Sequence, residues 1–367
     1  MTAISVNDPA LQRLIDRVQS ARAAGAQLCI RGGGTKDFYG EPPTGDVLDT
    51  RVLSGTSSYE PTELVVTTRC GTLLSELEAE LAEKGQCLPF EPPHFAPGTT
   101  VGGMVAAGLS GPARAAVGSV RDYVLGATLL NGNSEVMSFG GQVMKNVAGY
   151  DVSRLLAGSM GVLGVILEVS LKVLPMMPAT LTLRFEMAQA QALAQLNAWG
   201  GQPLPVNASA WWDGSLILRL RGALAAVQAA RARLGGEVVE PGHASPFWTG
   251  LRDHHDEFFT HAKAAVNGGA MLWRLSLPQT APPLGLSGEL LIEWGGAQRW
   301  LCSALPAGTV RDAAVQAGGH ATLFMAKSKT AGAFAPLKSP LDRIHRELKK
   351  SFDPLGVFNP GRLYPGL

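Results

Sequence analysis

A run of three glycines followed by a threonine and a lysine, RGGGTK at residues 31–36, is the first segment whose residue types suggest chemistry. It follows a short apolar stretch, QLCI, which is typical of a buried strand. Glycine loses more backbone freedom on folding than any other residue, so three in a row need a compensating role. Consecutive glycines expose their backbone N–H groups, and such a nest binds anions, including a diphosphate. A plain turn explains this segment about as well when it is considered alone.

A second glycine-rich segment, PGTTVGG at residues 97–103, has a similar composition. A Pro-Gly turn comes first, two hydroxyl donors follow, and the last two glycines are expected to open a short helix, whose N-terminus favours negative charge. The six residues concerned are Pro97, Gly98, Thr99, Thr100, Gly102 and Gly103. Two loops that can each face a phosphate indicate one diphosphate bound from two sides. The alternative for this segment is tight helix packing.

A third segment, KNVAGYDVSRLLAGSMGVLGVI at residues 145–166, could contact the flat part of a ligand. Gly161 and Gly164 allow a backbone edge to approach such a ligand, and Val165 and Ile166 could cover one face of it. Lys145 on its own is best explained as a solvated lysine. Residues 98–165 hold fourteen of the 44 glycines in the chain, more than turns alone require.

Composition and missing motifs exclude several classes of protein. The 31 basic residues nearly balance the 30 acidic ones, without a basic stripe for nucleic acid. The four cysteines lack Cys-x-x-Cys spacing, so no metal or iron–sulfur site is indicated, and buried thiols in a reducing compartment are expected. The dinucleotide fingerprint, the P-loop and His-Glu-x-x-His do not occur. With no apolar segment of signal or spanning length, we expect a soluble, cytoplasmic protein.

The pattern of predicted elements divides the 367 residues into three parts. Residues 1–176 form the first part, in which roughly the first 90 residues alternate helices and strands. Asp8 and Asp151 are expected to cap helices there, and Thr72 a helix over 72–85. Residues 177–325 are predicted to form a second, mixed lobe with strands and an Ala-rich helix. Residues 326–367 hold a charged helix and an extended end that is expected to return to the first part. Most tryptophans of the second lobe are expected in its core: Trp211, Trp212, Trp248, Trp273, Trp294 and Trp300.

Five segments together carry a family resemblance. In chain order they are RGGGTK, PGTTVGG, KNVAGYD, GSMGVLGVI and FDPLGVFNPGR. They resemble the vanillyl-alcohol-oxidase, or PCMH-type, flavoproteins, over roughly residues 1–175 and 335–367. The resemblance implies an α+β, two-subdomain FAD-binding fold with an inserted, smaller α+β cap lobe. Within that superfamily, HFAPGTTVGGMVAAGLSGPARAAVGSVRDYVLG, GGQVMKNVAGYDVSRLLAGSMG and GGHATLF are most similar to the E-type FAD-binding subunits of bacterial glycolate oxidases.

The resemblance implies a set of cofactor-binding residues and partners. FAD would be held by the two glycine-rich loops, by the segment at residues 161–166 and by the C-terminal motif. The residues concerned are Arg31, Gly32, Gly33, Gly34, Thr35, Lys36, Pro97, Gly98, Thr99, Thr100, Gly102, Gly103, Gly161, Gly164, Val165, Ile166, Asn359 and Arg362. Some relatives bond FAD covalently to a histidine in the first loop. Thr35 stands in that region, so non-covalent FAD is expected. The implied partners are a D-type flavin subunit and an iron–sulfur subunit, and any contact with the inner membrane would go through them.

The chain departs from the D-type subunits in its second lobe. Their Gly-Asn-Leu-His and Glu-His-Gly-x-Gly stretches, which bind a metal and polarise the substrate, do not occur. His320 stands alone in GGHATLF. His254 with Glu257, or His255 with Asp256, could help bind a metal, although a solvated helix face is the better interpretation. Arg252, Arg274 or Lys327 could bind a substrate carboxylate, although a surface role is favoured for each. The catalytic residues are therefore not identified.

Three functions remain open from the sequence. The first is an FAD-binding subunit that supports oxidation of glycolate, with electrons passed through flavin and an iron–sulfur partner. The second is a self-sufficient FAD-dependent 2-hydroxyacid dehydrogenase. The third is a non-catalytic scaffold with a relict flavin fold, against which the two intact glycine loops argue.

Overall fold

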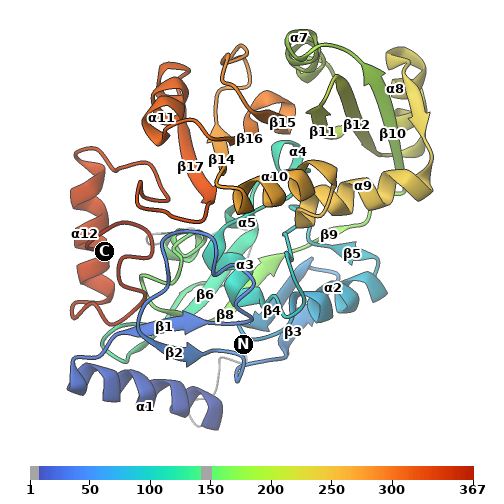
Figure 1. Ribbon diagram of the computed structural model, residues 1–367. Coiled ribbons are helices and arrows are strands. Elements are labelled where there is room, and N and C mark those ends of the chain that lie inside the picture. The colour runs from blue at the N-terminus through green and yellow to red at the C-terminus, as the bar shows by residue number, and fades with distance from the viewer. Residues whose placement is uncertain (1–7, 142–150) are drawn as a thin grey trace.

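Helix α1 (Pro9–Ala24) opens the part of the chain that the computed structural model describes, residues 8–141 and 151–367. The Asp8 carboxylate accepts a hydrogen bond from the Ala10 N–H at 2.8 Å, and Gly25 ends the helix in the left-handed conformation. The helix lies beside a two-stranded parallel sheet, β1 (Leu28–Arg31) and β2 (Asp46–Asp49) (Figure 1). The predicted cap and stop of α1 are confirmed.

The cap makes the stability of α1 dependent on pH. Asp8 also pairs with Arg69 at 2.9 Å, and the hydrogen bond from Ala10 is the largest cause that lowers its pKa below 3.8. Its stabilising effect is therefore present above pH 3.8 and is lost as the pH falls through the lowered value. Asp8→Ala should lower the free energy of unfolding by about 1 kcal/mol at pH 7. Urea unfolding should show a smaller difference at pH 3, whereas exposed Asp16→Ala should change little at either pH.

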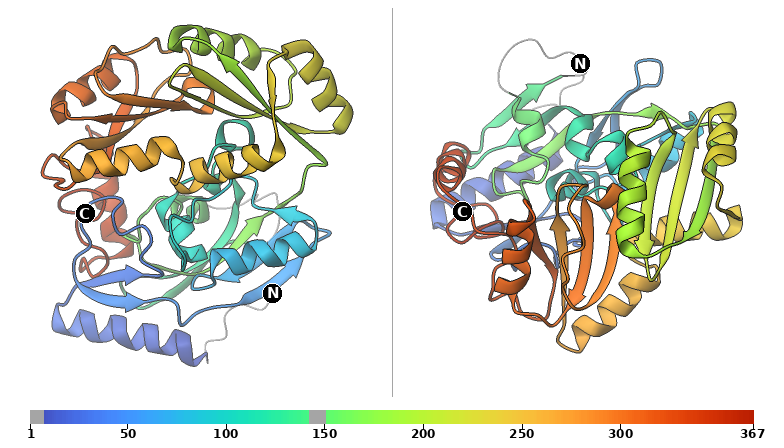
Figure 2. Two further views of the ribbon diagram at one scale, coloured as in Figure 1. Left: turned by 45° about the vertical axis from the view of Figure 1, so that its right-hand side comes forward. Right: turned by 90° about the horizontal axis from the view of Figure 1, so that it is seen from above.

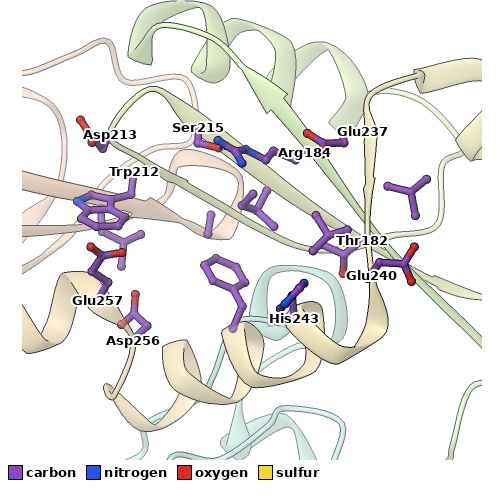
Figure 3. Close-up of a pocket in the computed structure, with 16 residues that line it drawn as sticks. Thr182, Arg184, Trp212, Asp213, Ser215, Glu237, Glu240, His243, Asp256 and Glu257 are labelled. Carbon is purple, nitrogen blue, oxygen red and sulfur yellow. The ribbon is translucent and has the colours of Figure 1, made fainter.

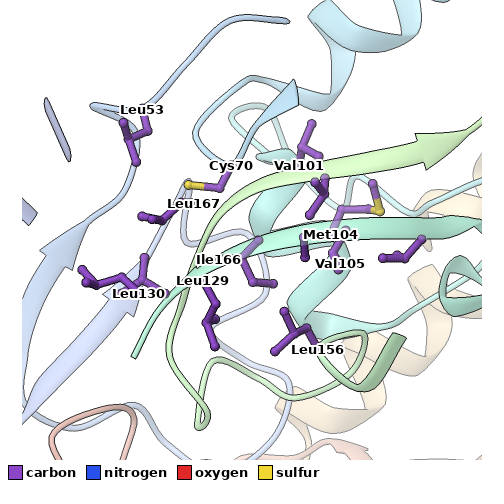
Figure 4. Close-up of a cluster of buried hydrophobic side chains, with 14 of the residues drawn as sticks. Leu53, Cys70, Val101, Met104, Val105, Leu129, Leu130, Leu156, Ile166 and Leu167 are labelled. Atoms are coloured by element: carbon purple, nitrogen blue, oxygen red, sulfur yellow. The ribbon is translucent and has the colours of Figure 1, made fainter. Parts of the chain in front are cut away.

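A five-stranded antiparallel sheet of order β3-β4-β8-β6-β7 forms the second subdomain. Its strands are β3 (Thr56–Glu60), β4 (Val65–Arg69), β6 (Val124–Leu130), β7 (Val136–Gly140) and β8 (Val165–Lys172). The helices of this part are α2 (Leu74–Glu83), α3 (Val101–Ala107), α4 (Arg114–Val117), α5 (Val120–Tyr123) and α6 (Val152–Leu155). Apolar side chains of α3 pack against those of β8 and β6 in a buried core (Figure 4). A short ribbon joins β5 (Gln86–Cys87) to β9 (Leu174–Pro175).

The helix caps of this subdomain are only partly as predicted. Asp151 caps α6 by accepting a hydrogen bond from the Arg154 N–H at 3.3 Å. Thr72 does not cap α2, which begins at Leu74 without a side-chain cap. Its hydroxyl instead accepts a hydrogen bond from the Gly55 N–H at 2.9 Å and contacts the Thr68 hydroxyl at 3.0 Å. The Thr72 hydroxyl is therefore bound to Gly55 and Thr68 and not to the N-terminus of α2.

An eight-stranded antiparallel sheet of order β13-β10-β12-β11-β15-β16-β14-β17 forms the upper layer of the molecule (Figure 1). Its strands are β10 (Ala179–Glu186), β11 (Val206–Trp212), β12 (Ser215–Gly222), β13 (Glu237–Val239), β14 (Met271–Ser276), β15 (Glu289–Glu293), β16 (Gln298–Ser303) and β17 (His320–Met325). Its helices are α7 (Gln189–Gly200), α8 (Leu224–Leu234), α9 (Pro241–Asp253), α10 (Glu257–Asn267) and α11 (Ala307–Gln316), with a 3-10 turn at Trp294–Gly296. Helices α9 and α10 lie between this sheet and the lower layer (Figure 2). The fold is α+β, as expected.

The six tryptophans that were expected in the core of the upper layer divide between full and partial burial. Trp248, Trp273 and Trp300 are buried. The other three, Trp211, Trp212 and Trp294, are half-buried, and each indole N–H donates a hydrogen bond within the chain. Three of these six tryptophans therefore have the expected position in the core.

The C-terminal segment packs against the first subdomain. After α12 (Leu341–Phe352), Phe358 pairs with Leu28 of β1. The buried Lys349 ammonium donates to the carbonyl oxygens of Val162 and Phe358 at 2.7 and 2.8 Å and to the Asp353 carboxylate at 2.6 Å. These contacts agree with the predicted return of the tail, while the division of the chain at residues 176 and 325 stays a prediction.

Candidate cofactor site

The two glycine-rich loops lie against each other. The Thr35 and Thr99 hydroxyls are 2.8 Å apart, and the Thr99 hydroxyl donates to the His94 carbonyl oxygen at 2.5 Å. Beside them is a small cavity of about 90 Å³ that both loops line. Its lining includes residues 29–37 together with Pro43, Thr100, Gly103, Ala106, Ala107, Met160, Asn359 and Arg362. The structure thus brings together segments that are more than 60 residues apart in the sequence.

Glycine is required at two positions of the first loop by the approach of the second. A Cβ atom on Gly32 would lie 2.2 Å from the Thr100 Oγ1, and one on Gly33 would lie 1.7 Å from the Gly98 carbonyl oxygen. Neither separation is possible without movement of the loops. Gly34 has φ +71°, in the left-handed region that favours glycine. The glycines therefore serve the contact between the loops as well as any ligand.

Unpaired amides gather on both loops. Within the part of the chain that the structure describes, the N–H groups of residues 32–36 and 98–100 donate to no protein acceptor. Thr99 and Thr100 are buried residues, and buried N–H groups nearly always have an acceptor. By contrast, the N–H groups of Gly102 and Gly103 already donate, to the Cys70 carbonyl oxygen and the Thr100 hydroxyl. The free donors of the second segment thus precede α3 and do not belong to its first turn.

Arg31 and Lys36, at the two ends of the first loop, differ in their exposure to solvent and in their partners. Arg31 is exposed and forms an ion pair with Asp37 at 2.7 Å. Lys36 is buried, and its Nζ lies 3.4 Å from the Thr35 hydroxyl. Burial lowers the pKa of Lys36 to about 8, although nearby Asp253 favours the charged form.

The C-terminal motif supports the first loop from behind. The Asn359 side chain accepts from the Ile30 N–H at 2.7 Å and donates to the Met160 carbonyl oxygen at 2.6 Å. The Arg362 guanidinium donates to the carbonyl oxygens of Lys36 and Asp37, each at 3.1 Å, and also to that of Glu41. Both side chains therefore hold the backbone that carries the glycines.

The residues predicted around 161–166 lie behind the cavity rather than along it. Val165 and Ile166 are buried in β8 and pair with Leu130 and Leu129 of β6. A Cβ atom on Gly164 would lie 2.6 Å from the Leu130 carbonyl oxygen, and one on Gly161 would lie 2.6 Å from the Asn359 side-chain nitrogen. Packing against β6 and against the C-terminal segment thus accounts for all four residues. Pro97 and Gly98 are exposed at the rim, and Lys145 lies outside the described residues.

An aromatic cluster, which the sequence analysis missed, adjoins the cavity. It consists of Phe38, Phe95, His254, Phe259, Trp300 and Phe324, drawn from both layers of the molecule. The Phe95 ring lies 5.5 Å from Lys36 Nζ, 5.3 Å from the Phe38 ring and 4.9 Å from the His254 ring. The six rings come from separate loops, helix α10 and strands β16 and β17, so no local pattern in the sequence marks the cluster.

The histidines considered as metal ligands have other surroundings. The His254 ring stacks on Phe259 at 3.6 Å, and burial lowers its pKa well below 6.5, so it is neutral. Asp256 caps α10, and burial raises its pKa to about 6, whereas His255 and Glu257 are exposed. In residues 8–141 and 151–367, no three His, Cys, Asp or Glu side chains gather as a metal site. His320 is exposed at the start of β17.

The cations proposed for a substrate carboxylate are engaged elsewhere or exposed. Arg252 is paired with Asp253 at 2.7 Å. Arg274 donates to the Tyr39 hydroxyl at 3.2 Å, and Lys327 is exposed.

A larger cavity of about 590 Å³ lies between the upper sheet and helices α9 and α10, lined by acidic groups such as Glu240 (Figure 3). None of the predicted cofactor residues lines it.

Comparison with known proteins identifies the class of this protein. Residues 11–140 match the family model of the FAD binding domain. Two crystal structures of alkyldihydroxyacetonephosphate synthase share the fold at TM-score 0.64, with 15% and 16% identity, over 95% of this chain and 74% and 75% of theirs. The protein is an FAD-binding flavoprotein of the oxidoreductase type.

The chain belongs to the family of the glycolate oxidase subunit GlcE. It is 48% identical to GlcE of Escherichia coli over 97% of this chain and 98% of that protein. It is 31% identical to the glycolate oxidase subunit GlcD of Bacillus subtilis over 40% of this chain and 31% of that protein. It is 33% identical to D-lactate dehydrogenase of Archaeoglobus fulgidus over 40% of this chain and 33% of that protein. Among the described residues, no helix has the length and apolar character needed to cross a membrane.

Proposed function

We propose that this chain is the FAD-binding, electron-relaying subunit of a multi-subunit glycolate oxidase. In this proposal glycolate is oxidised to glyoxylate on a D-type flavin subunit, and electrons leave through an iron–sulfur subunit. Similarity to both GlcE and GlcD supports a complex of several subunits. We place the complex in the cytoplasm, with any contact to the inner membrane made by the partners.

The unpaired amides of the two loops are the proposed diphosphate donors. The N–H groups of residues 32–34 and 98–100 surround or adjoin the cavity. At the glycines among these residues there is no side chain to shield the N–H group from a ligand. When bound, FAD supplies the redox chemistry, and this chain orients it and excludes water. The cavity of about 90 Å³ matches only a phosphate-sized part of FAD, so the rest of the cofactor would extend beyond it. Thr35 is no nucleophile for a covalent flavin bond, so binding is non-covalent.

The aromatic cluster is the observation that carries the relay role. Oxidation of a 2-hydroxyacid needs a base for the hydroxyl proton and a cation for the carboxylate. Beside Lys36 the structure places hydrocarbon rings, and His254, the titratable member of the cluster, is stacked face to face on Phe259. Arg252 and Arg274 are already engaged. This environment suits a flavin that exchanges electrons rather than one that binds a hydroxyacid.

Reduction of the isolated chain tests this proposal. The purified protein should be yellow, and acid precipitation should release all of its flavin. Anaerobic glycolate or D-lactate should leave the flavin absorbance of the isolated chain unchanged and should bleach it once the D-type subunit is added. Bleaching of the isolated chain would instead establish a self-sufficient dehydrogenase. A correctly folded chain without flavin, at saturating FAD, would establish the scaffold function.

A further inference from the structure

The cavity of about 590 Å³ in the upper layer has an apolar lining and no role in the proposed cofactor site. Its walls are strands β10, β11, β12, β13 and β15, helix α9 and the start of α10 (Figure 3). Apolar side chains such as Ile217 and Leu291 line it, together with the half-buried rings of Trp212 and Phe247. Its volume lies in the range of about 300–1,000 Å³ that is typical of small-molecule sites. The cavity is therefore large enough for an organic ligand with an apolar body.

Five carboxylates line the same cavity, and none of them has a cation as its partner. They are Asp213, Glu237, Glu240, Asp256 and Glu257. Among residues 8–141 and 151–367, no Lys, Arg or His nitrogen lies within 4.0 Å of their side-chain oxygens. Arg184, the one lysine or arginine among the described residues of the lining, pairs with Glu186 at 2.6 Å. Because like charges repel, the five acids favour a positively charged ligand.

Asp256 and Thr182 each lack a partner that a ligand would supply. Asp256 is half-buried, and burial raises its pKa. Lys263 favours the charged form of Asp256, but its Nζ donates to the His254 carbonyl oxygen at 2.6 Å. Thr182 is 3% exposed, and its hydroxyl accepts from the Trp248 indole N–H at 3.0 Å but donates to no acceptor in the part of the chain that the structure describes. A buried donor without an acceptor costs free energy, so a ligand oxygen beside Thr182 would be stabilising.

The charge of the cavity separates its ligand from FAD and from glycolate. The diphosphate of FAD and the carboxylate of glycolate are anions, which five carboxylates repel. The cavity also shares no lining residue with the one between the two glycine-rich loops. Its ligand is therefore distinct from the cofactor and the substrate of the proposed function.

We propose that this cavity binds a small organic cation, in which an ammonium group is joined to an apolar or aromatic body that carries an oxygen atom. Asp256 caps α10 and Glu257 begins it, and the Trp212 ring packs against His261 of the same helix, with the ring centroids 6.0 Å apart. An ammonium group at the start of α10 thus has two carboxylates and an aromatic ring as neighbours, which is a favourable environment for an organic cation. The body of the ligand lies on the apolar lining, and its oxygen accepts from Thr182.

Calorimetric titration of the full chain with tyramine tests the proposal. Tyramine has an ammonium group, an aromatic ring and a phenol oxygen, whereas phloretate has the same ring and chain with a carboxylate in place of the ammonium group. We expect tyramine to bind and phloretate not to bind. Asp256→Asn, which keeps a capping side chain, should raise the Kd of tyramine about tenfold to a hundredfold. The exposed Asp312→Asn on α11 should match the wild type.

Four results would overturn the proposal. The first is a wild type that does not bind tyramine at millimolar concentration, and the second is equal binding of phloretate. The third is an unchanged Kd in Asp256→Asn, once circular dichroism shows that this variant is folded. If it does not fold, the exposed Glu257→Gln provides the same comparison. Binding of tetralysine without binding of tyramine would make the cavity a docking surface for a basic segment of another protein instead.

Discussion

Replacement of Glu91 by alanine should destabilise the fold strongly, with a loss of about 3–5 kcal/mol in the free energy of unfolding. Both oxygens of this carboxylate lie 2.7 Å from the Arg219 guanidinium, and Arg221 approaches it at 3.1 Å. It also accepts a hydrogen bond from the Ala113 N–H at 3.1 Å. Arg219 is 3% exposed, so the alanine variant leaves a buried charge unpaired. The contact joins the upper layer to the segment that leads into the second glycine loop.

The backbone at Glu91 adds to this expectation. Its φ is +50°, in the left-handed region that non-glycine residues seldom occupy. A side chain in such a conformation persists when its surroundings hold it there, and here four hydrogen bonds do so.

Glu186 provides a matched control for Glu91, because it pairs with Arg184 on the surface at 2.6 Å. Glu186→Ala should change stability by less than about 1 kcal/mol. Urea denaturation of the three proteins measures both effects. Similar, small losses in the two variants would show that the contact between Glu91 and Arg219 does not stabilise the fold.

Gly33→Ala should weaken FAD binding about tenfold to a hundredfold, and Gly33→Glu should abolish it. The added Cβ atom would lie 1.7 Å from the Gly98 carbonyl oxygen, so the two loops must separate. Overpacking of this kind costs about 1–3 kcal/mol, and about 1.4 kcal/mol corresponds to a factor of ten in Kd. Glutamate adds negative charge where the proposed diphosphate binds. Fluorescence titration of the flavin-stripped protein measures the Kd.

Gly200→Ala is the control for this series. An added Cβ atom at Gly200 meets nothing within 4 Å, so FAD binding should equal that of the wild type. Circular dichroism of the flavin-free variants separates loss of binding from loss of folding. Full flavin occupancy in a folded Gly33→Glu variant would contradict the assignment of this loop to the diphosphate.

Local patterns in the sequence identified what depends on local chemistry. Asp8 and Asp151 could be recognised as caps because the groups they bind lie within three residues. The two glycine loops could be singled out because consecutive glycines leave their backbone N–H groups unshielded. The family, the α+β class and FAD followed from the same segments, and the matches to the FAD binding domain and to GlcE confirm them.

Partners distant in the sequence decided the rest. Thr72 was predicted as a cap, but its hydroxyl binds Gly55, which no local pattern indicates. Gly102 and Gly103 were predicted to open a helix whose N-terminus favours negative charge, but the Cys70 carbonyl oxygen and the Thr100 hydroxyl already accept their hydrogen bonds.

Burial separates the sequence from the structure most clearly at three charged residues. Glu91 and Arg219 are 128 positions apart, and their pairing exists only because the upper sheet packs onto the lower layer. In the sequence, Lys36 is simply the last residue of RGGGTK, and nothing nearby indicates that it is buried. The packing of Phe95 and its neighbours makes it a buried cation. The sequence by itself determined which glycine-rich segments can expose their backbone N–H groups, because that property belongs to the backbone of a few consecutive residues. The tertiary structure alone decided which charges lose water and which partners compensate them, because desolvation depends on all the atoms that surround a group.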